Sequence, residues 1–162
     1  MKRIAFAAVL LLVLTGCGVQ PTDVVLAGQG PDGIARGPVL YFVTGEPGQV
    51  RPSIRETGRL GTVTDALRLL AAGPTDAEGA AGLRTELPFL TTEQVSAGAP
   101  DAGIVTVQLP VPPSTLSELA STQLICTAVR VSAMAGANAQ KLMVRLSGSG
   151  EIGKPLLCPA TR

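Results

Sequence analysis

The 162-residue sequence contains no histidine, and this absence removes several kinds of chemistry. Ser-His-Asp and Cys-His nucleophile systems need an imidazole, and so do histidine-based metal sites. The three cysteines also lack the paired spacing that holds zinc. We therefore expect no metal, no cofactor and no histidine-dependent catalysis in this chain.

Clustered basic charge is missing as well. The whole chain has 13 Lys and Arg against 12 Asp and Glu, and 11 basic residues remain without Lys2 and Arg3, which belong to the amino-terminal segment described next. A nucleic-acid-binding face needs concentrated positive charge. The near-neutral balance predicts no nucleic-acid partner, and the remaining length is enough for one domain with its own core.

The longest apolar run, residues 4–14, is shorter than the roughly 20 residues that span a bilayer. It follows the positive Met1-Lys2-Arg3 and precedes Leu14-Thr15-Gly16-Cys17, which is the layout of a secretory signal peptide. The last four residues resemble the lipobox of bacterial lipoproteins, whose cysteine receives a diacylglyceryl group and becomes the first mature residue. An ordinary signal peptide followed by an incidental cysteine is the alternative.

This resemblance predicts a lipoprotein signal peptide over residues 1–16 and lipidation at Cys17. Acyl chains of the palmitate type would then hold the protein on the extracytoplasmic face of the cell membrane, because two chains anchor stably where one is marginal. Residues 17–37, rich in Gly, Pro, Asp and Gln, are predicted to form a flexible tether after the lipidated cysteine.

Two further cysteines, Cys126 and Cys158, lie in a chain that is predicted to be exported. An even pair outside the cytosol favours a disulfide. Closing a loop of about 32 residues would stabilise the fold by roughly 3–4 kcal/mol. The alternative is a pair of buried free thiols. With the bridge, the carboxy-terminal tail, residues 149–162, would be pinned to the domain over residues 38–148.

Strand signals occur in two groups. The dense β-branched and aromatic run 38–43 predicts a strand buried on both faces, and the turn 45–48 leads to a partner strand over 50–56. Pro52 favours an edge position for that partner. Three more strands are predicted, and the first two of them form a hairpin. Their ranges are 92–97, 104–109 and 141–146.

Two helices are predicted between these strands. The first begins at Thr62, with Asp65 completing a capping box, and ends at Gly73-Pro74. Its apolar face is Val63, Ala66, Leu67, Leu70 and Ala71. Residues 75–82 then form a loop. The second helix begins at Thr115, with Glu118 in the capping box, and ends near Gly136. The order of elements predicts an α+β fold of two layers, with two helices on one face of a mixed, mainly antiparallel sheet.

Several stretches together resemble the GerMN domain, the sporulation and spore-germination domain of Gram-positive bacteria. The resemblance covers about residues 38–148. Its motifs are Leu40-Tyr41-Phe42, Leu69-Leu70-Ala71-Ala72-Gly73-Pro74, Gly82-Leu83-Arg84-Thr85 with Leu87-Pro88, and Gln123-Leu124-Ile125-Cys126-Thr127-Ala128. It implies an envelope lipoprotein linked to sporulation, germination or envelope signalling, and it supplies no catalytic residues. We expect a single copy with no further domain, which departs from the family's larger architectures.

Acidic and basic side chains leave two chemical alternatives open. Glu86 and Glu93 are candidates for a carboxylate-based peptidoglycan hydrolase, although paired acids must face each other across a sugar, and solvated surface acids are the alternative. Arg51 and Arg55 share a predicted strand face, which could bind anionic wall polymer or lipid headgroups or be simply solvated.

These observations predict a non-enzymatic, lipid-anchored binding or scaffold module of the cell envelope. The predicted partners are the plasma membrane through the lipid anchor, and an envelope or membrane protein or a cell-wall component. Binding of a small ligand or a cell-wall fragment in a cleft is the alternative, and peptidoglycan hydrolysis is a further one.

Overall fold

The computed structural model describes residues 37–88, 90 and 92–159. The chain divides into two units, Met1–Asp32 and Gly33–Arg162, and the description below concerns the second. The predicted signal peptide, Cys17 and the tether before residue 37 lie outside the described residues. In chain order, the elements are β1 (Val39–Thr44), β2 (Gln49–Ile54), α2 (Val63–Ala71), α3 (Asp76–Ala80), η2 (Thr92–Gln94), β3 (Ser96–Ala97), β4 (Ile104–Leu109), η3 (Pro113–Thr115), α4 (Glu118–Met134), β5 (Met143–Gly148) and β6 (Glu151–Ile152).

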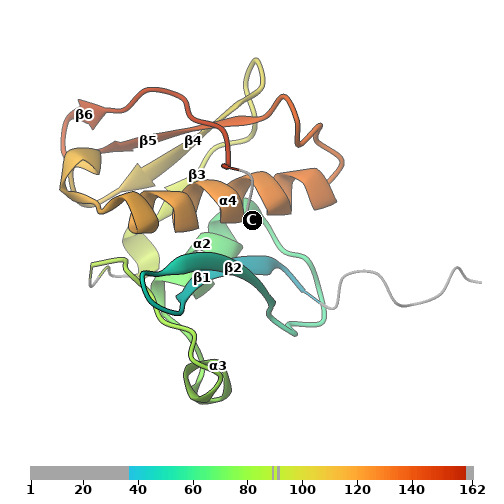
Figure 1. The fold of residues 1–162 in the computed structure, drawn as a ribbon. Helices are drawn as coiled ribbons and strands as arrows, with labels where there is room; N and C mark the ends of the chain where they lie inside the picture. Colours follow the sequence, from blue (N-terminus) through green and yellow to red (C-terminus); the bar gives the residue numbers. More distant parts are fainter. Residues whose placement is uncertain (1–36, 89, 91, 160–162) are drawn as a thin grey trace, which may run out of the picture. The chain divides into compact units, whose positions relative to one another are not determined.

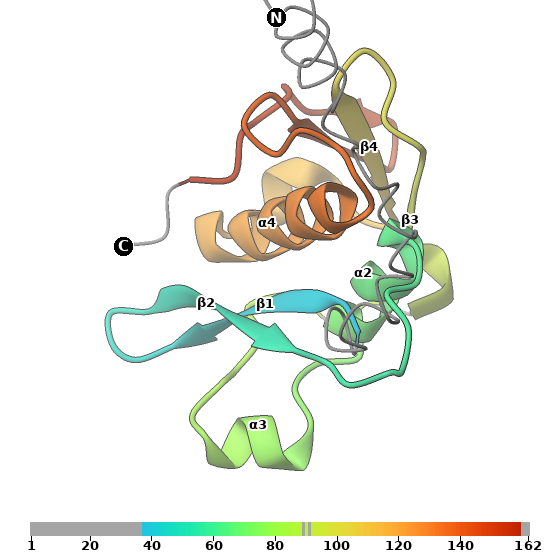
Figure 2. The same ribbon diagram turned by 90° about the vertical axis from the view of Figure 1, so that its right-hand side faces the viewer.

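The predicted α+β class is confirmed, with two main helices packed on mixed, mainly antiparallel sheets. The strands form two sheets where the sequence predicted one: an antiparallel pair β1–β2, and a four-stranded sheet in the order β3-β4-β5-β6. Only the β4–β5 pair of these is parallel. Helix α4 contacts both sheets and lies between them in Figures 1 and 2.

Helix side chains form hydrogen bonds to one strand edge of each sheet. On β1, the backbone N–H of Tyr41 donates to Oγ1 of Thr127, and its carbonyl accepts from Nε2 of Gln123, both on α4. On β3, the backbone N–H and carbonyl of Ala97 both bond to the hydroxyl of Thr64 on α2. An edge whose polar groups are already paired cannot add another strand.

The β1–β2 hairpin confirms the two predicted strands and the edge position of Pro52. Because both polar backbone groups of Tyr41 turn toward α4, Tyr41 and its cross-strand partner Pro52 form a non-hydrogen-bonded pair. The backbone of Pro52 therefore faces the outer edge of β2. Proline has no N–H to donate there, so its position costs the ladder nothing.

Helix α2 has the predicted beginning and end. Thr62 and Asp65 form a reciprocal capping box, and Ala66, Leu67 and Leu70 are buried. Gly73 has φ +84°, which is the left-handed conformation that glycine adopts most readily after a helix.

The predicted loop 75–82 is wrong in part, because it contains the short helix α3. Thr75 and Glu78 form a second capping box, in which the side chain of each residue accepts a hydrogen bond from the backbone N–H of the other. None of the five residues of α3 is buried. The sequence therefore offered no apolar periodicity to indicate a helix, and the short cap motif was the only signal.

Helix α4 begins later than predicted, and the Thr115–Glu118 capping box is wrong. Thr115 belongs to η3, where its hydroxyl donates to the carbonyl of Pro112. Leu116 is extended, and Ser117 is the actual cap, accepting from the N–H of Ala120 at 3.0 Å. Seven consecutive residues, 123–129, are buried, because the helix is covered by β1, α2 and β5 on different sides.

The remaining strands differ from their predictions at the ends. Residues 92–97 were predicted as one strand, but they divide into the 3₁₀ turn η2 and the two-residue β3. The tail was not predicted to contain a strand. It adds β6 to the edge of β5, and Leu156 then exchanges two backbone hydrogen bonds with Val144, each 2.8 Å long.

Candidate functional site

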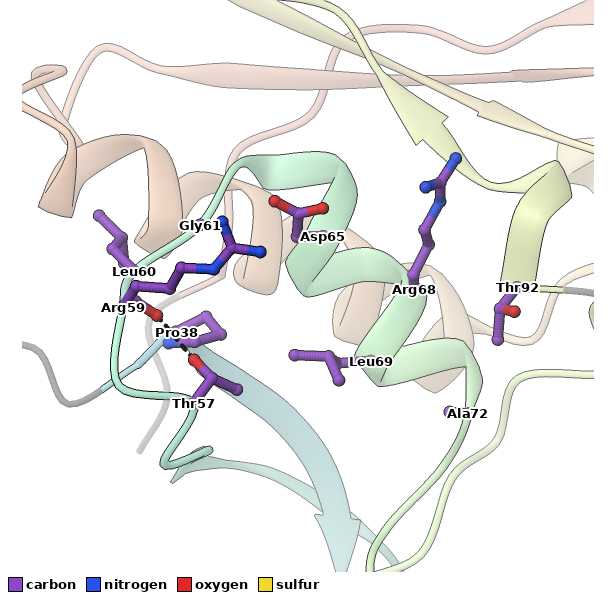
Figure 3. A pocket seen from close by; sticks show the side chains of 10 residues that line it. All are labelled: Pro38, Thr57, Arg59, Leu60, Gly61, Asp65, Arg68, Leu69, Ala72 and Thr92. Atoms are coloured by element: carbon purple, nitrogen blue, oxygen red, sulfur yellow. Dashed lines mark hydrogen bonds between the residues drawn. The ribbon is translucent and has the colours of Figure 1, made fainter.

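A cavity of about 430 Å³ opens along the outer side of α2, and it is named the α2 groove here. Its walls come from the start of the first hairpin, the segment that leads into α2, and α2 itself (Figure 3). The lining residues are Pro38, Thr57, Arg59, Leu60, Gly61, Asp65, Arg68, Leu69, Ala72 and Thr92. Cavities of roughly 300–1,000 Å³ are typical of small-molecule sites.

The apolar part of the groove comes from Leu60, Leu69, Ala72 and Pro38. Because Ala66, Leu67 and Leu70 turn into the core, Leu69 is left on the groove side of α2, where it is half-buried. Figure 3 shows its side chain directed toward Pro38 and Thr57. A leucine outside the core-facing set of an amphipathic helix was the signal by which the sequence could have indicated this groove.

The charged part of the groove consists of Arg59, Asp65 and Arg68. Hydrogen bonds from the backbone and side chain of Thr62 lower the pKa of Asp65. Burial opposes them, and the charges of Arg59 and Arg68 lower the pKa further. Asp65 is therefore ionised at neutral pH. Two guanidinium groups and one carboxylate give the groove one net positive charge.

Arg55 holds the end of α2 near this groove. Its Nη2 ion-pairs with Glu78 of α3 at 2.6 Å and donates to the carbonyl of Gly73 at 3.3 Å. The guanidinium also lies 5.8 Å from the centre of the Phe42 ring, a cation–π distance. The hypothesis of a solvated basic face shared by Arg51 and Arg55 is therefore wrong for Arg55, because its side chain is largely buried in an ion pair.

A second hollow of about 530 Å³ continues from the carboxyl end of α2 and shares Ala72 and Thr92 with the α2 groove. The rest of its lining comes from the end of α2 and the segment before η2. These further lining residues are Ala71, Gly73, Thr85, Leu87, Pro88 and Leu90.

The acidic candidates are not gathered at the α2 groove. Glu86 and Glu46 approach Arg84, with oxygen-to-nitrogen distances of 3.4 and 3.8 Å. Glu93 is exposed in η2. Across residues 37–88, 90 and 92–159, no group of three or more potential ligands among His, Cys, Asp and Glu is placed to hold a metal ion.

The predicted disulfide between Cys126 and Cys158 is present, with the two Cα atoms 4.8 Å apart. Cys126 is buried in the middle of α4, and Cys158 packs against the core. The bridge joins the tail to α4. It is a structural element and lies apart from the α2 groove, because neither cysteine lines that cavity.

Comparison with known proteins supports a membrane attachment. A family model of the prokaryotic membrane lipoprotein lipid attachment site matches residues 1–17, which end at Cys17, and the chain is a membrane-anchored lipoprotein. None of the helices in the described ranges is both long enough and apolar enough to cross a bilayer. No curated protein matches the chain.

Among solved structures, the chain is similar to the tandem GerMN domains of the sporulation protein GerM from Bacillus subtilis. The sequence identity is 17% and the TM-score 0.49, and the match covers 76% of this chain. It covers 45% of that chain, less than half of its length.

Proposed function

We propose that this lipoprotein is a non-enzymatic binding module on the extracytoplasmic face of the cell membrane, with the α2 groove as its binding surface. The observation that carries the proposal is the cavity itself, an apolar recess with charged groups at its rim. Sites of this composition bind ligands through the apolar surface and orient them through a few polar groups.

The position of Pro38 connects the groove to the lipid anchor. Pro38 lines the cavity and directly follows the predicted tether that begins at Cys17. About 21 residues of chain reach at most roughly 70 Å when fully extended. The anchor therefore keeps the groove near the membrane surface, which favours a membrane protein, an envelope protein or a cell-wall component as partner.

Site-specific photo-crosslinking in cells tests this proposal. A photoreactive amino acid replaces Thr57, which lines the groove, and in a matched variant it replaces Gln108, which is exposed on β4. We expect a discrete envelope product from position 57, a much weaker one from position 108, and loss of the product when Cys17→Ala removes the anchor. The same products from both positions would contradict the proposal.

The proposal that this protein is not an enzyme has its own test. Zymography on peptidoglycan with the mature protein should give no clearing. Clearing that disappears in Glu86→Gln or Glu93→Gln would overturn this part and establish the carboxylate alternative. The link to sporulation, germination or envelope signalling stays a prediction from the sequence resemblance.

A further inference from the structure

We propose that the α2 groove binds an anionic amphiphile, with an aliphatic chain on Leu60, Leu69 and Ala72 and a carboxylate or phosphate at the positively charged rim to which Arg59 and Arg68 contribute on either side of Asp65. This inference rests on the proposed function and deepens it, because it names the ligand class of the same site.

The aliphatic part follows from the composition of the groove. Leu69 extends from α2 into the space bounded by Pro38 and Thr57, as Figure 3 shows, and Leu60 adds a second half-buried leucine. When a ligand covers apolar surface that was in contact with water, the complex is stabilised by roughly 25 cal/mol for each Å² covered. A purely polar ligand such as a sugar would leave this surface unused.

The anionic part follows from the two arginines. Within the described residues, neither Arg59 nor Arg68 takes part in an ion pair within 4.0 Å. Arg68 donates its Nε to the carbonyl of Val95 at 3.4 Å, and Figure 3 shows its side chain directed away from Leu69, with Asp65 between the Arg59 and Arg68 guanidinium groups. Asp65 offsets only one of the two positive charges, and its own acceptor capacity is partly used by Thr62. Guanidinium groups bind carboxylate and phosphate through charge-assisted hydrogen bonds.

The location of the groove favours a ligand that partitions into membranes. The lipid attachment site matches residues 1–17, and the chain enters the folded domain beside the groove at Pro38. A membrane-derived amphiphile is therefore concentrated where the groove is held. Fatty acids and phospholipid headgroups share the required chemistry, and the experiment below separates them.

The test uses the mature lipidated protein in phosphatidylcholine vesicles. Three photoreactive probes of equal chain length are compared: a dodecanoic acid, a dodecyl phosphate and the neutral dodecanol. Mass spectrometry after digestion with a protease that does not cut at arginine locates the label. We expect labelling of residues 57–72 by the acid, the phosphate or both, and about tenfold less by the alcohol, which corresponds to one charge-assisted contact.

Two double variants make the test specific. Arg59→Gln with Arg68→Gln should reduce labelling by the anionic probes about tenfold and leave the small alcohol signal unchanged. Arg130→Gln with Arg145→Gln, on α4 and β5 and outside the groove lining, should leave all labelling unchanged. Unaltered circular dichroism and urea unfolding show that each variant is folded.

Labelling by the acid alone assigns a fatty-acid type of ligand, and labelling by the phosphate alone assigns a phospholipid type. Equal labelling by the alcohol, or labelling unaffected by the groove variant, overturns the inference. A cell-wall fragment crosslinked from position 57 without amphiphile labelling also overturns it, but leaves the proposed function standing. Loss of every anchor-dependent crosslink from position 57 is the separate failure of the proposed function.

Discussion

Gln123 of α4 and Tyr41 of β1, 82 residues apart in the sequence, are joined by a hydrogen bond from Nε2 of the glutamine to the backbone carbonyl at 2.9 Å. The Oε1 of Gln123 accepts from the N–H of Glu86 at 2.8 Å, so one fully buried amide holds two separate segments against α4. Thr127, one turn later, accepts from the N–H of Tyr41. The glutamine and threonine of the motif that resembles the GerMN domain therefore form hydrogen bonds with both backbone polar groups of Tyr41, on the edge of β1 that faces α4.

Replacing Gln123 with leucine should lower the free energy of unfolding by about 1–3 kcal/mol, because the carbonyl of Tyr41 and the N–H of Glu86 lose their buried partner. Urea unfolding of the mature protein measures the change. The matched substitution Gln108→Leu, at an exposed position of β4, should change stability by less than about 0.5 kcal/mol. Similar effects at both positions would show that the buried amide contributes nothing specific.

Replacing Pro52 with valine should promote association between copies of the protein. The substitution adds a backbone N–H on the outer edge of β2, where exposed donors can pair with another strand. Sedimentation velocity at increasing concentration measures the association. Ile54→Val, which keeps the proline, serves as the control and should behave like the wild type.

Acid should destabilise the protein partly through Glu78. Burial raises its pKa, but hydrogen bonds from Thr75 and Ser53 and the charge of Arg55 outweigh burial, so the pKa lies below the ordinary value of 4.5. A depressed folded-state pKa contributes stability above about pH 4.5, and this stability is lost as the pH falls through the folded value.

The Glu78→Gln variant tests this pH dependence. It should be less stable than the wild type at pH 7, by about 1–3 kcal/mol. The difference should shrink as the pH falls below 4.5, measured by urea unfolding at each pH. Because Asp65 titrates in both proteins, its contribution cancels in the comparison. A difference that is the same at pH 7 and pH 3 would refute the assignment.

Removing the Cys126–Cys158 bridge should lower the free energy of unfolding by about 3–4 kcal/mol, since it closes a separation of 32 residues. Cys126→Ser with Cys158→Ser is compared with the wild type before and after reduction. Reduction should affect only the wild type. Alkylation under denaturing, non-reducing conditions should find neither thiol free, and modification of both would contradict the bridge.

Cys17 should carry the lipid. Metabolic labelling with an alkyne analogue of palmitate should mark the wild-type protein and leave Cys17→Ala unlabelled. The wild type should remain with the membrane fraction after high-salt washing, because two acyl chains anchor stably. Cys158→Ala, which keeps Cys17, is the control and should still be labelled. Label retained in Cys17→Ala would place the lipid elsewhere.

The sequence determined those features that depend on neighbouring residues. The capping box of Thr62 and Asp65, the left-handed Gly73 and the edge proline Pro52 are each local, and each is present as predicted. The attachment signal is also local, since the family model of the attachment site matches residues 1–17.

Local signals also misled where two of them competed. Thr115 and Glu118 have capping-box spacing, but the prolines before Thr115 favour a 3₁₀ turn, and Ser117 is placed to cap the helix instead. The short helix α3 lacked any apolar periodicity, so only its cap could have indicated it.

Only the tertiary structure decided how many sheets form and where the groove lies. Gln123, Thr127 and Thr64 separate the sheets by hydrogen bonds to strands distant in sequence, which no local pattern specifies. In the same way, Arg55 and Glu78 form a largely buried ion pair, and Leu69 and Pro38 line the same groove. These contacts depend on the packing of whole elements, because burial of the shared core sets which side chains face each other.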